Sequence, residues 1–264
     1  MIKSMPMHTL HLIERHAEMP EEAMVSFVIP VYNEERCLAD NVSVLEAYAA
    51  QLNIPHELVL VNDGSTDASL EICLAIAGEN PHVRVLGQPV NRGKGFAVRT
   101  GMLSSRGVFR IFMDADLAVP VDYIENCIAC LAKGADVVIG SRHLPGASIR
   151  VPEEAVRQTL GGIYRRLVLS AFGLQVTDIT CGLKGFGKSA AEAVFRRSRI
   201  DRWGYDAEIL FLAQHLGLVF REIPVDWYHS FDSDVHIIKD SFRTLVEMFQ
   251  IYFRYAAGRY HLSR

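Results

Sequence analysis

The sequence predicts an α/β fold with a Rossmann-like, mostly parallel central sheet flanked by helices, followed by a C-terminal amphipathic helix. Short apolar runs rich in β-branched residues alternate with segments of helical spacing, which is typical of consecutive βαβ units. The runs are apolar at successive positions, as expected for strands that helices cover on both faces of a sheet. The chain has 264 residues, of which 50% are hydrophobic and 22% charged, and this fits one large globular domain or two small ones.

Strands and helices alternate regularly in the first half of the chain. The predicted strands span residues 25–31, 57–61, 83–86, 108–113 and 136–139. The predicted helices between them span residues 34–52, 67–77, 95–104 and 121–133. Each helix is long enough to connect two parallel strands. Residues 1–22 lack such spacing, and we expect them to form a flexible N-terminal arm.

The alternation is looser after Gly140. We predict helices over residues 153–172, 189–196 and 205–216, a glycine-rich passage over residues 180–187, and a strand over residues 218–225. No repeat and no flexible linker separates the two halves, so we predict one domain over residues 23–234.

The C-terminal segment, residues 235–264, contains a predicted amphipathic helix over residues 235–255. One side of this helix is apolar and carries Ile238, Phe242, Leu245, Phe249, Tyr252 and Phe253. The sequence leaves three alternatives for what this apolar side packs on: a membrane surface, the protein's own core or a second subunit. A peripheral membrane protein and a homo-oligomer therefore both stay open.

The composition excludes several classes of protein. Lys and Arg total 27 against 31 Asp and Glu, and the net charge of −4 excludes the strongly basic surface of a nucleic-acid-binding protein. Five sparse cysteines fit a reducing compartment better than a disulfide framework. The longest apolar stretches, residues 167–177 and 209–220, are shorter than the ~20 residues that span a bilayer. We therefore expect a cytoplasmic protein without a transmembrane segment, free or held peripherally on the membrane face.

Polar side chains follow the first four predicted strands. These runs are residues 30–34 (Pro-Val-Tyr-Asn-Glu), 62–67 (Asn-Asp-Gly-Ser-Thr-Asp), 91–95 (Asn-Arg-Gly-Lys-Gly) and 114–116 (Asp-Ala-Asp). Any one of them alone is ordinary turn chemistry, but ligands of open parallel sheets bind beyond the carboxyl ends of the strands. Asp114 and Asp116 cannot both enter the core unpaired. Together they suit a hard divalent cation, Mg²⁺ or Mn²⁺, that bridges a diphosphate.

Taken together, these residues resemble the family 2 glycosyltransferases, which have the GT-A fold, over residues 25 to about 230. The resemblance implies a nucleotide-sugar half at residues 23–116 and an acceptor half at residues 117–234. It implies donor binding by Pro30, Tyr32, Asn33, Glu34, Asp63, Gly64, Gly93, Lys94, Asp114 and Ala115. By the same likeness Asp63 would contact the base and Glu34 and Asp114 the nucleoside. Asp116, with Asp114, would hold the metal.

Motifs in the second half are similar to the branch that transfers sugars to polyprenyl phosphates, including the dolichyl-phosphate glucosyltransferases. They are residues 140–142 (Gly-Ser-Arg), 178–184 (Asp-Ile-Thr-Cys-Gly-Leu-Lys), 202–208 (Arg-Trp-Gly-Tyr-Asp-Ala-Glu) and 222–227 (Glu-Ile-Pro-Val-Asp-Trp). The resemblance implies an inverting transfer of a hexose, glucose from UDP-glucose, to a dolichyl or undecaprenyl phosphate. Acceptor binding would fall to Arg142, Lys184, Arg202 and Trp203. Catalytic roles would fall to Asp116, Arg142, Asp178 and Asp206.

A phosphate acceptor changes what catalysis requires. Its second ionisation lies near pH ~6, so it is largely anionic at neutral pH and needs cations that position it. Asp178 or Asp206 is then essential as a base only if the acceptor is a hydroxyl. Either carboxylate can instead orient the cations or the sugar.

Two other functions stay open. A GT-A transferase acting on a small non-lipid acceptor would share every donor residue. Residues 182–189 (Gly-Leu-Lys-Gly-Phe-Gly-Lys-Ser) match the phosphate-binding loop of P-loop nucleotide hydrolases. Against that alternative, no apolar strand ending in Asp follows at a suitable distance.

Overall fold

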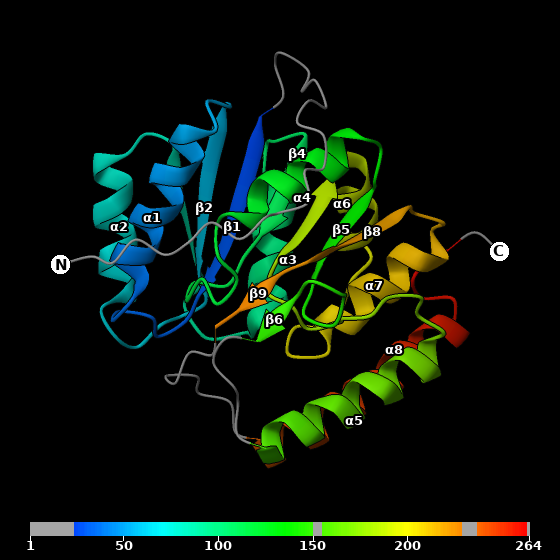
Figure 1. The fold of residues 1–264 in the computed structure, drawn as a ribbon. Coiled ribbons are helices and arrows are strands. Elements are labelled where there is room, and N and C mark those ends of the chain that lie inside the picture. Colours follow the sequence, from blue (N-terminus) through cyan, green and yellow to red (C-terminus); the bar gives the residue numbers. More distant parts are fainter. Residues whose placement is uncertain (1–23, 150–154, 229–236, 263–264) are drawn as a thin grey trace.

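The computed structural model describes residues 24–149, 155–228 and 237–262, which form a seven-stranded sheet with helices on both faces (Figure 1). The strand order is β3-β2-β1-β4-β7-β5-β8. The strands are β1 (Val25–Val31), β2 (His56–Asn62), β3 (Val83–Gly87), β4 (Phe109–Phe112), β5 (Val137–Ser141), β7 (Lys184–Gly187) and β8 (Phe220–Pro224). The predicted α/β class is confirmed. The arm predicted at residues 1–22, and the first residues of the helices predicted from 153 and 235, lie outside the described residues.

The first half of the chain forms the parallel part of the sheet. β1 pairs with β2 and β4, and β2 pairs with β3, all in parallel. The connecting helices are α1 (Leu38–Gln51), α2 (Ser69–Glu79), α3 (Lys94–Ser104) and α4 (Tyr123–Ala132). One core lies between the sheet and α3 and the other between the sheet and α1, α2 and α4, so the strands are apolar on both sides. The carboxyl ends of β1, β2 and β4 therefore lie at one edge of the sheet.

Strand β7 is the main difference from the expected architecture. The glycine-rich passage at residues 180–187 ends in this strand, which runs antiparallel between β4 and β5, and Lys184 is paired with both Phe112 and Ile139. A Cβ on Gly185 would collide with the Cys127 sulfur on α4, so glycine lets the helix approach the strand closely. Because residues 184–187 are a central strand rather than an exposed loop, the P-loop alternative for residues 182–189 is wrong.

The remaining elements of the second half complete the two faces. Helices α6 (Lys188–Phe195) and α7 (Tyr205–His215) join the core on the α3 side, and β8 pairs in parallel with β5. The short strands β6 (Ser148–Ile149) and β9 (Asp226–Trp227) form a separate two-stranded ribbon.

Two long helices lie beside each other away from the sheet: α5 (Ala155–Phe172) and α8 (Ile237–Ala256) (Figure 1). The Gly161-Gly162 pair does not interrupt α5. Ile251 of α8 and Tyr260 just after it are buried in the core on the α3 side, so α8 is anchored to the domain along one face. Within the described residues, none of the helices combines the length and the apolarity required to cross a membrane.

Candidate active site

Hydrogen bonds join the loops that follow β1 and β2. The amide of Asn33 donates to Ser65 Oγ (3.1 Å), and the Asn33 side chain accepts from the amide of Thr66 (2.8 Å). The amide of Glu34 donates to Ser69 Oγ (2.8 Å). These bonds hold residues 33–36 outside the helix, so α1 begins at Leu38 rather than at the predicted residue 34. Pro30 lies in β1, while Tyr32 beyond its end is exposed.

Asp63, at the end of β2, ties down the loop before α3. Its carboxylate is buried and accepts hydrogen bonds from the amides of Arg92 (3.0 Å) and Gly93 (2.7 Å). Burial raises the pKa of Asp63, and the two amides oppose that rise. Gly64 has φ +70°, and any Cβ there would collide with the backbone of Val90. The side chain predicted to contact a base therefore also fixes the backbone of the 91–95 run.

Gly93 is where the two halves of the chain meet. It has φ +113°, and a Cβ would lie 2.5 Å from the carbonyl oxygen of Asp201 and 2.6 Å from Cγ of Arg202. Only glycine accommodates both the left-handed backbone and this approach. The 91–95 run and the loop that carries Arg202 and Trp203 are thus in direct contact.

The carboxylates of Glu34, Asp114 and Asp116 act on one another electrostatically beyond β1 and β4, and the ammonium group of Lys94 lies beside Asp114. Lys94, the first residue of α3, places Nζ 2.7 Å from Oδ1 of Asp114. Burial raises the pKa of Glu34, and the carboxylates of Asp116 and Asp114 raise it further. Burial and then the carboxylate of Asp114 likewise raise the pKa of Asp116. Such mutual repulsion is the electrostatic condition that a bound cation relieves.

The backbone around the acidic pair is held from two sides. Asn41 of α1 donates to the carbonyl of Ala115 (2.8 Å), and Asp116 Oδ1 accepts from the amide of Ala118 (3.1 Å). Within the described residues, no three His, Cys, Asp or Glu side chains converge closely enough to hold a metal ion. Asp114 and Asp116 are neighbours at the sheet edge, but their present arrangement is not a complete ligand set.

The second half brings a buried ion pair up to Asp114. A Cβ on Gly182 would lie 2.5 Å from Oδ2 of Asp114, so the Cys-Gly turn packs directly on that carboxylate. Two residues later, Lys184 is fully buried and its Nζ lies 2.6 Å from Oδ1 of Asp206. The same ammonium donates to the carbonyl of Cys181 (2.7 Å). Burial raises the pKa of Asp206, while the ammonium groups of Lys184 and Lys94 oppose that rise.

Arg142 and Asp178 form a second pair, at the end of β5. The guanidinium donates from Nε (2.8 Å) and Nη2 (3.0 Å) to the two carboxylate oxygens, and the Arg142 amide donates as well (3.0 Å). Nη2 also reaches Thr180 Oγ1 (2.8 Å), and the guanidinium carbon lies 5.4 Å from the ring centre of Trp227. Burial alone would raise the pKa of Asp178, but Arg142 holds it well below its ordinary value. Asp178 is therefore engaged as a counter-ion of Arg142.

Arg202 and Trp203 lie on the loop before α7. Arg202 Nη1 is 3.5 Å from Oδ1 of Asn91, and Trp203 is 38% exposed. The Nζ of Lys94 lies 5.8 Å from the centre of the Trp203 ring. Lys94 thus stands between the acidic pair and the loop predicted to bind the acceptor.

Three residues outside the predicted set hold that loop in place. Glu208 is buried and accepts from the amides of Arg199 and Ile200 (both 2.8 Å) and from the hydroxyl of Tyr260 (2.6 Å). Glu247 of α8 accepts from the amide of Gly204 (2.7 Å). Glu208 belongs to the Arg-Trp-x-x-Asp-x-Glu motif and could have been included, whereas no spacing in the sequence connects Glu247 or Tyr260 to the loop.

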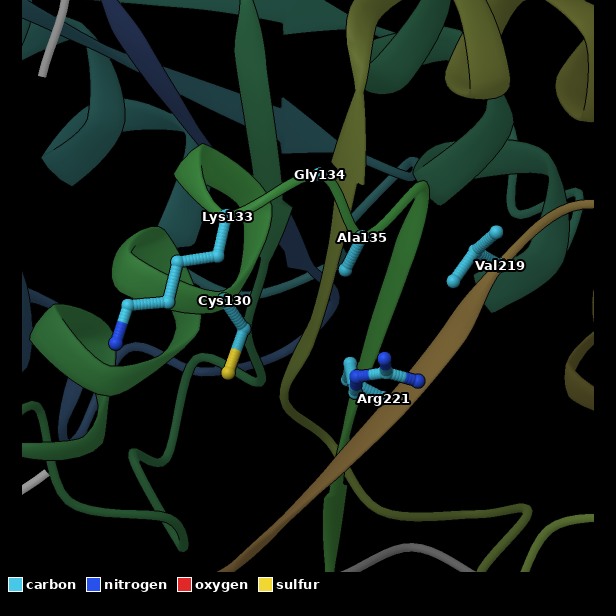
Figure 2. A pocket seen from close by; sticks show the side chains of 6 residues that line it. All are labelled: Cys130, Lys133, Gly134, Ala135, Val219 and Arg221. Atoms are coloured by element: carbon cyan, nitrogen blue, oxygen red, sulfur yellow. The ribbon is translucent and has the colours of Figure 1, made fainter. Parts of the chain in front are cut away.

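A cleft of about 250 Å³ lies elsewhere, at the amino ends of β5 and β8 (Figure 2). It is lined by Cys130, Lys133, Gly134, Ala135, Val219 and Arg221. It holds none of the predicted site residues and lies at the sheet edge opposite the acidic pair.

The comparison with protein families identifies the scaffold that carries this site. The family described as "Glycosyl transferase family 2" matches residues 26–195, a span that includes the first four strands and β7. The chain belongs to glycosyltransferase family 2. This glycosyltransferase has the fold and the enzyme class that its sequence predicts.

Within the family, the chain is similar in sequence to several dolichyl-phosphate beta-glucosyltransferases. The chain is 34% identical over 251 residues to dolichyl-phosphate beta-glucosyltransferase ALG5C of Trichomonas vaginalis, covering 90% of this chain and 74% of that protein. It is 33% identical over 263 residues to the dolichyl-phosphate beta-glucosyltransferase of Saccharomyces cerevisiae (91% and 77%). Its identity to the human enzyme of that name is 31% over 221 residues (77% and 67%).

Solved structures agree on the fold. Glucosyl-3-phosphoglycerate synthase from Mycobacterium tuberculosis, in complex with Mn²⁺, UDP and glucosyl-3-phosphoglycerate, superposes with a TM-score of 0.61 at 18% identity, covering 86% of this chain and 78% of that one. The mannosyltransferase PcManGT from Pyrobaculum calidifontis, in complex with GDP-Man and Mn²⁺, gives 0.60 at 20% identity (87% and 64%). The glycosyltransferase thus shares the GT-A fold with enzymes that bind Mn²⁺ and a nucleotide or nucleotide sugar.

Proposed function

We propose that this glycosyltransferase moves a hexose, glucose from UDP-glucose, to the phosphate of a polyprenyl lipid with inversion at the anomeric carbon. The observation that carries the proposal is the contact between an acidic pair and cations at one sheet edge: Asp114 touches Lys94, and the loop of Arg202 packs on Gly93. Carboxylates suit a metal-bound diphosphate donor, and cations suit an anionic acceptor. The names of the relatives support glucose and dolichyl phosphate.

The donor would bind in the nucleotide-sugar half, residues 23–116. Asp114 and Asp116 fit Mg²⁺ or Mn²⁺, because both are carboxylates and because Asp114 raises the pKa of its neighbour. When bound, the ion would neutralise negative charge on the departing diphosphate. Asp63 keeps the 91–95 run in place for the nucleoside, and Lys94 supplies a positive charge beside the diphosphate.

The acceptor would bind in the half formed by residues 117–234. Of the predicted set, Trp203 is exposed, Arg202 and Arg142 are half-buried, and Arg142 lies beside the Trp227 ring. Lys184 is fully buried, so we assign it the role of holding Asp206 rather than touching the lipid phosphate. Asp178 orients Arg142. Neither aspartate has to accept a proton, since a phosphate acceptor is already anionic at neutral pH.

The test is a transfer assay with radiolabelled UDP-glucose, Mg²⁺ or Mn²⁺, and detergent-dispersed dolichyl or undecaprenyl phosphate. Asp116→Asn keeps the shape of the side chain but removes its charge, and we expect activity to fall by about 10²-fold or more, as for other preorganised electrostatic groups. Asp122→Asn is the matched control, because Asp122 is exposed at the start of α4.

Three results would contradict the proposal. Full activity of Asp116→Asn, or full activity in the presence of EDTA, would remove the metal role. Glucose transfer to a small phosphorylated acceptor, with none to the lipid, would establish the small-acceptor alternative instead.

A further inference from the structure

The outward side of α8 is apolar although none of the residues that the structure describes covers it. Ile251 and Glu247 mark the buried side, and Tyr255 packs edge-on against Phe211 with 5.1 Å between ring centres. At about 100° per residue, Phe249 and Phe253 point away from that buried side. They are 65% and 66% exposed. A helix that is apolar on both sides is expected to be buried on both sides.

The exposed apolar residues continue onto the neighbouring helix. We define the α5–α8 surface by Ile163 and Leu167 of α5 and by Leu245, Phe249, Tyr252 and Phe253 of α8, all of them exposed. The two helices contact one another and project from the domain together (Figure 1). Clustered apolar side chains of this size mark a place where a partner or a membrane docks.

Charge distinguishes between the possible occupants. Among the described side chains of α5 and α8, the arginines exposed to solvent are Arg166 and Arg243. Arg165 and Arg254 instead face the domain, where Arg165 donates to the carbonyl of Thr177 and Arg254 acts on Glu208. The one described carboxylate of the two helices, Glu247, is buried against the amide of Gly204. The local charge is positive although the whole chain carries −4. A second copy would bring arginines against arginines, while an anionic lipid surface complements both the apolar residues and the cations.

We propose that the α5–α8 surface docks onto a membrane surface that contains anionic lipids, with Phe249 and Phe253 inserted at the level of the headgroups. The same helix holds the predicted acceptor loop, because Glu247, on the side of α8 that faces the domain, accepts a hydrogen bond from the amide of Gly204, next to Trp203. Docking would therefore hold Arg202 and Trp203 about one helix diameter, ~10 Å, from the headgroup layer, where the phosphate of a polyprenyl acceptor lies. This last step rests on the proposed function, whereas the docking itself does not.

The test measures binding of the whole chain to vesicles without substrates. We expect co-sedimentation with vesicles of equimolar phosphatidylcholine and phosphatidylglycerol, weaker binding to phosphatidylcholine alone, and a decrease at high salt. The double substitution Phe249→Ser and Phe253→Ser should weaken binding by about tenfold or more, because it removes two aromatic side chains from the interface. Leu74→Ser with Val90→Ser is the matched control, since both residues are exposed elsewhere, at 56% and 63%.

Two readouts separate docking from catalysis. Glucose transfer to detergent-dispersed acceptor should be unchanged in the double phenylalanine variant, while transfer to acceptor embedded in vesicles should fall with binding. Vesicle binding equal to wild type in that variant would overturn the proposal. A wild-type dimer in sedimentation that the variant dissociates, with no vesicle binding by either protein, would assign the surface to a second copy. Vesicle binding without transfer in any assay would leave docking standing and refute the proposed function.

Discussion

Replacing Arg142 by methionine should destabilise the protein strongly at neutral pH. Asp178 is 1% exposed, and two of its hydrogen bonds come from the guanidinium, at 2.8 and 3.0 Å. Each charged hydrogen bond contributes about 1.5–3 kcal/mol. Removal of one partner of a buried ion pair costs about 3–5 kcal/mol, since it leaves a charge without compensation. We therefore expect the free energy of unfolding to fall by ~3–5 kcal/mol, measured by urea denaturation with tryptophan fluorescence.

The dependence of this loss on pH identifies its cause. Arg142 holds the pKa of Asp178 below its ordinary value, so the pair stabilises the fold above pH ~4 and loses that contribution as the pH falls through the folded-state pKa. In Arg142→Met the unpaired buried carboxyl should instead have a raised pKa and become neutral in mild acid. The difference between wild type and variant should therefore shrink from pH 7 to pH 4. A small difference at pH 7, or one that stays constant with pH, would refute the assignment of Asp178 as a counter-ion. Arg106→Met, at an exposed arginine, is the control.

Three further outcomes follow from the same contacts. Lys94→Met removes a positive charge that lowers the pKa of Asp116, so the acidic limb of the pH–rate profile should move to higher pH and activity should fall by about tenfold. An acidic limb at the wild-type pH would show that Lys94 does not act on Asp116. Gly93→Ala should abolish activity and destabilise the fold by more than the control Gly134→Ala. Gly134 has a similar φ of +93° but no neighbour within 4 Å, so its substitution should lower the free energy of unfolding in urea denaturation by only about 1–2 kcal/mol. Equal losses would exclude the steric contact. Tyr260→Phe removes the hydroxyl that donates to the buried carboxylate of Glu208, and we expect a loss of about 1–3 kcal/mol by the same measurement. Tyr252→Phe, at a side chain that is 58% exposed, should cause none.

The sequence predicts which residues meet beyond β1, β2 and β4, because parallel strands align their carboxyl ends. Once residues 25–31, 57–61 and 108–113 were assigned as strands, the side chains after them had to meet at one edge. The contacts of Asp63 with the 91–95 run and of Lys94 with Asp114 follow from that topology. The spacing does not indicate that both carboxylate oxygens of Asp63 accept hydrogen bonds from backbone amides.

The acceptor side depended on contacts that are distant in the sequence. Strand β7 is not predictable from the sequence, because a glycine-rich segment with a lysine lacks the apolar pattern of a central strand. Burial of Lys184 is made tolerable by Asp206, 22 residues later, and by the carbonyl of Cys181. The sequence contains the charged residues Asp178 and Asp206, but it does not indicate that they pair with Arg142 and Lys184. The connection from α8 to the acceptor loop through Glu247 has no local signature at all.

In the proposed function, the two ion pairs would hold cations in position for anionic substrates. Burial of Arg142 or Lys184 without a partner would cost the hydration energy of its charge, and Asp178 and Asp206 compensate that cost. Arg142 lies nearer the surface than Lys184, so an acceptor phosphate can share its guanidinium with Asp178, whereas Lys184 stays committed to Asp206. Substituting Lys184 should therefore act chiefly on folding, and substituting Arg202 chiefly on the KM for the acceptor. If Arg202→Met leaves the KM for the acceptor unchanged but lowers the free energy of unfolding, Arg202 acts on folding and not on acceptor binding.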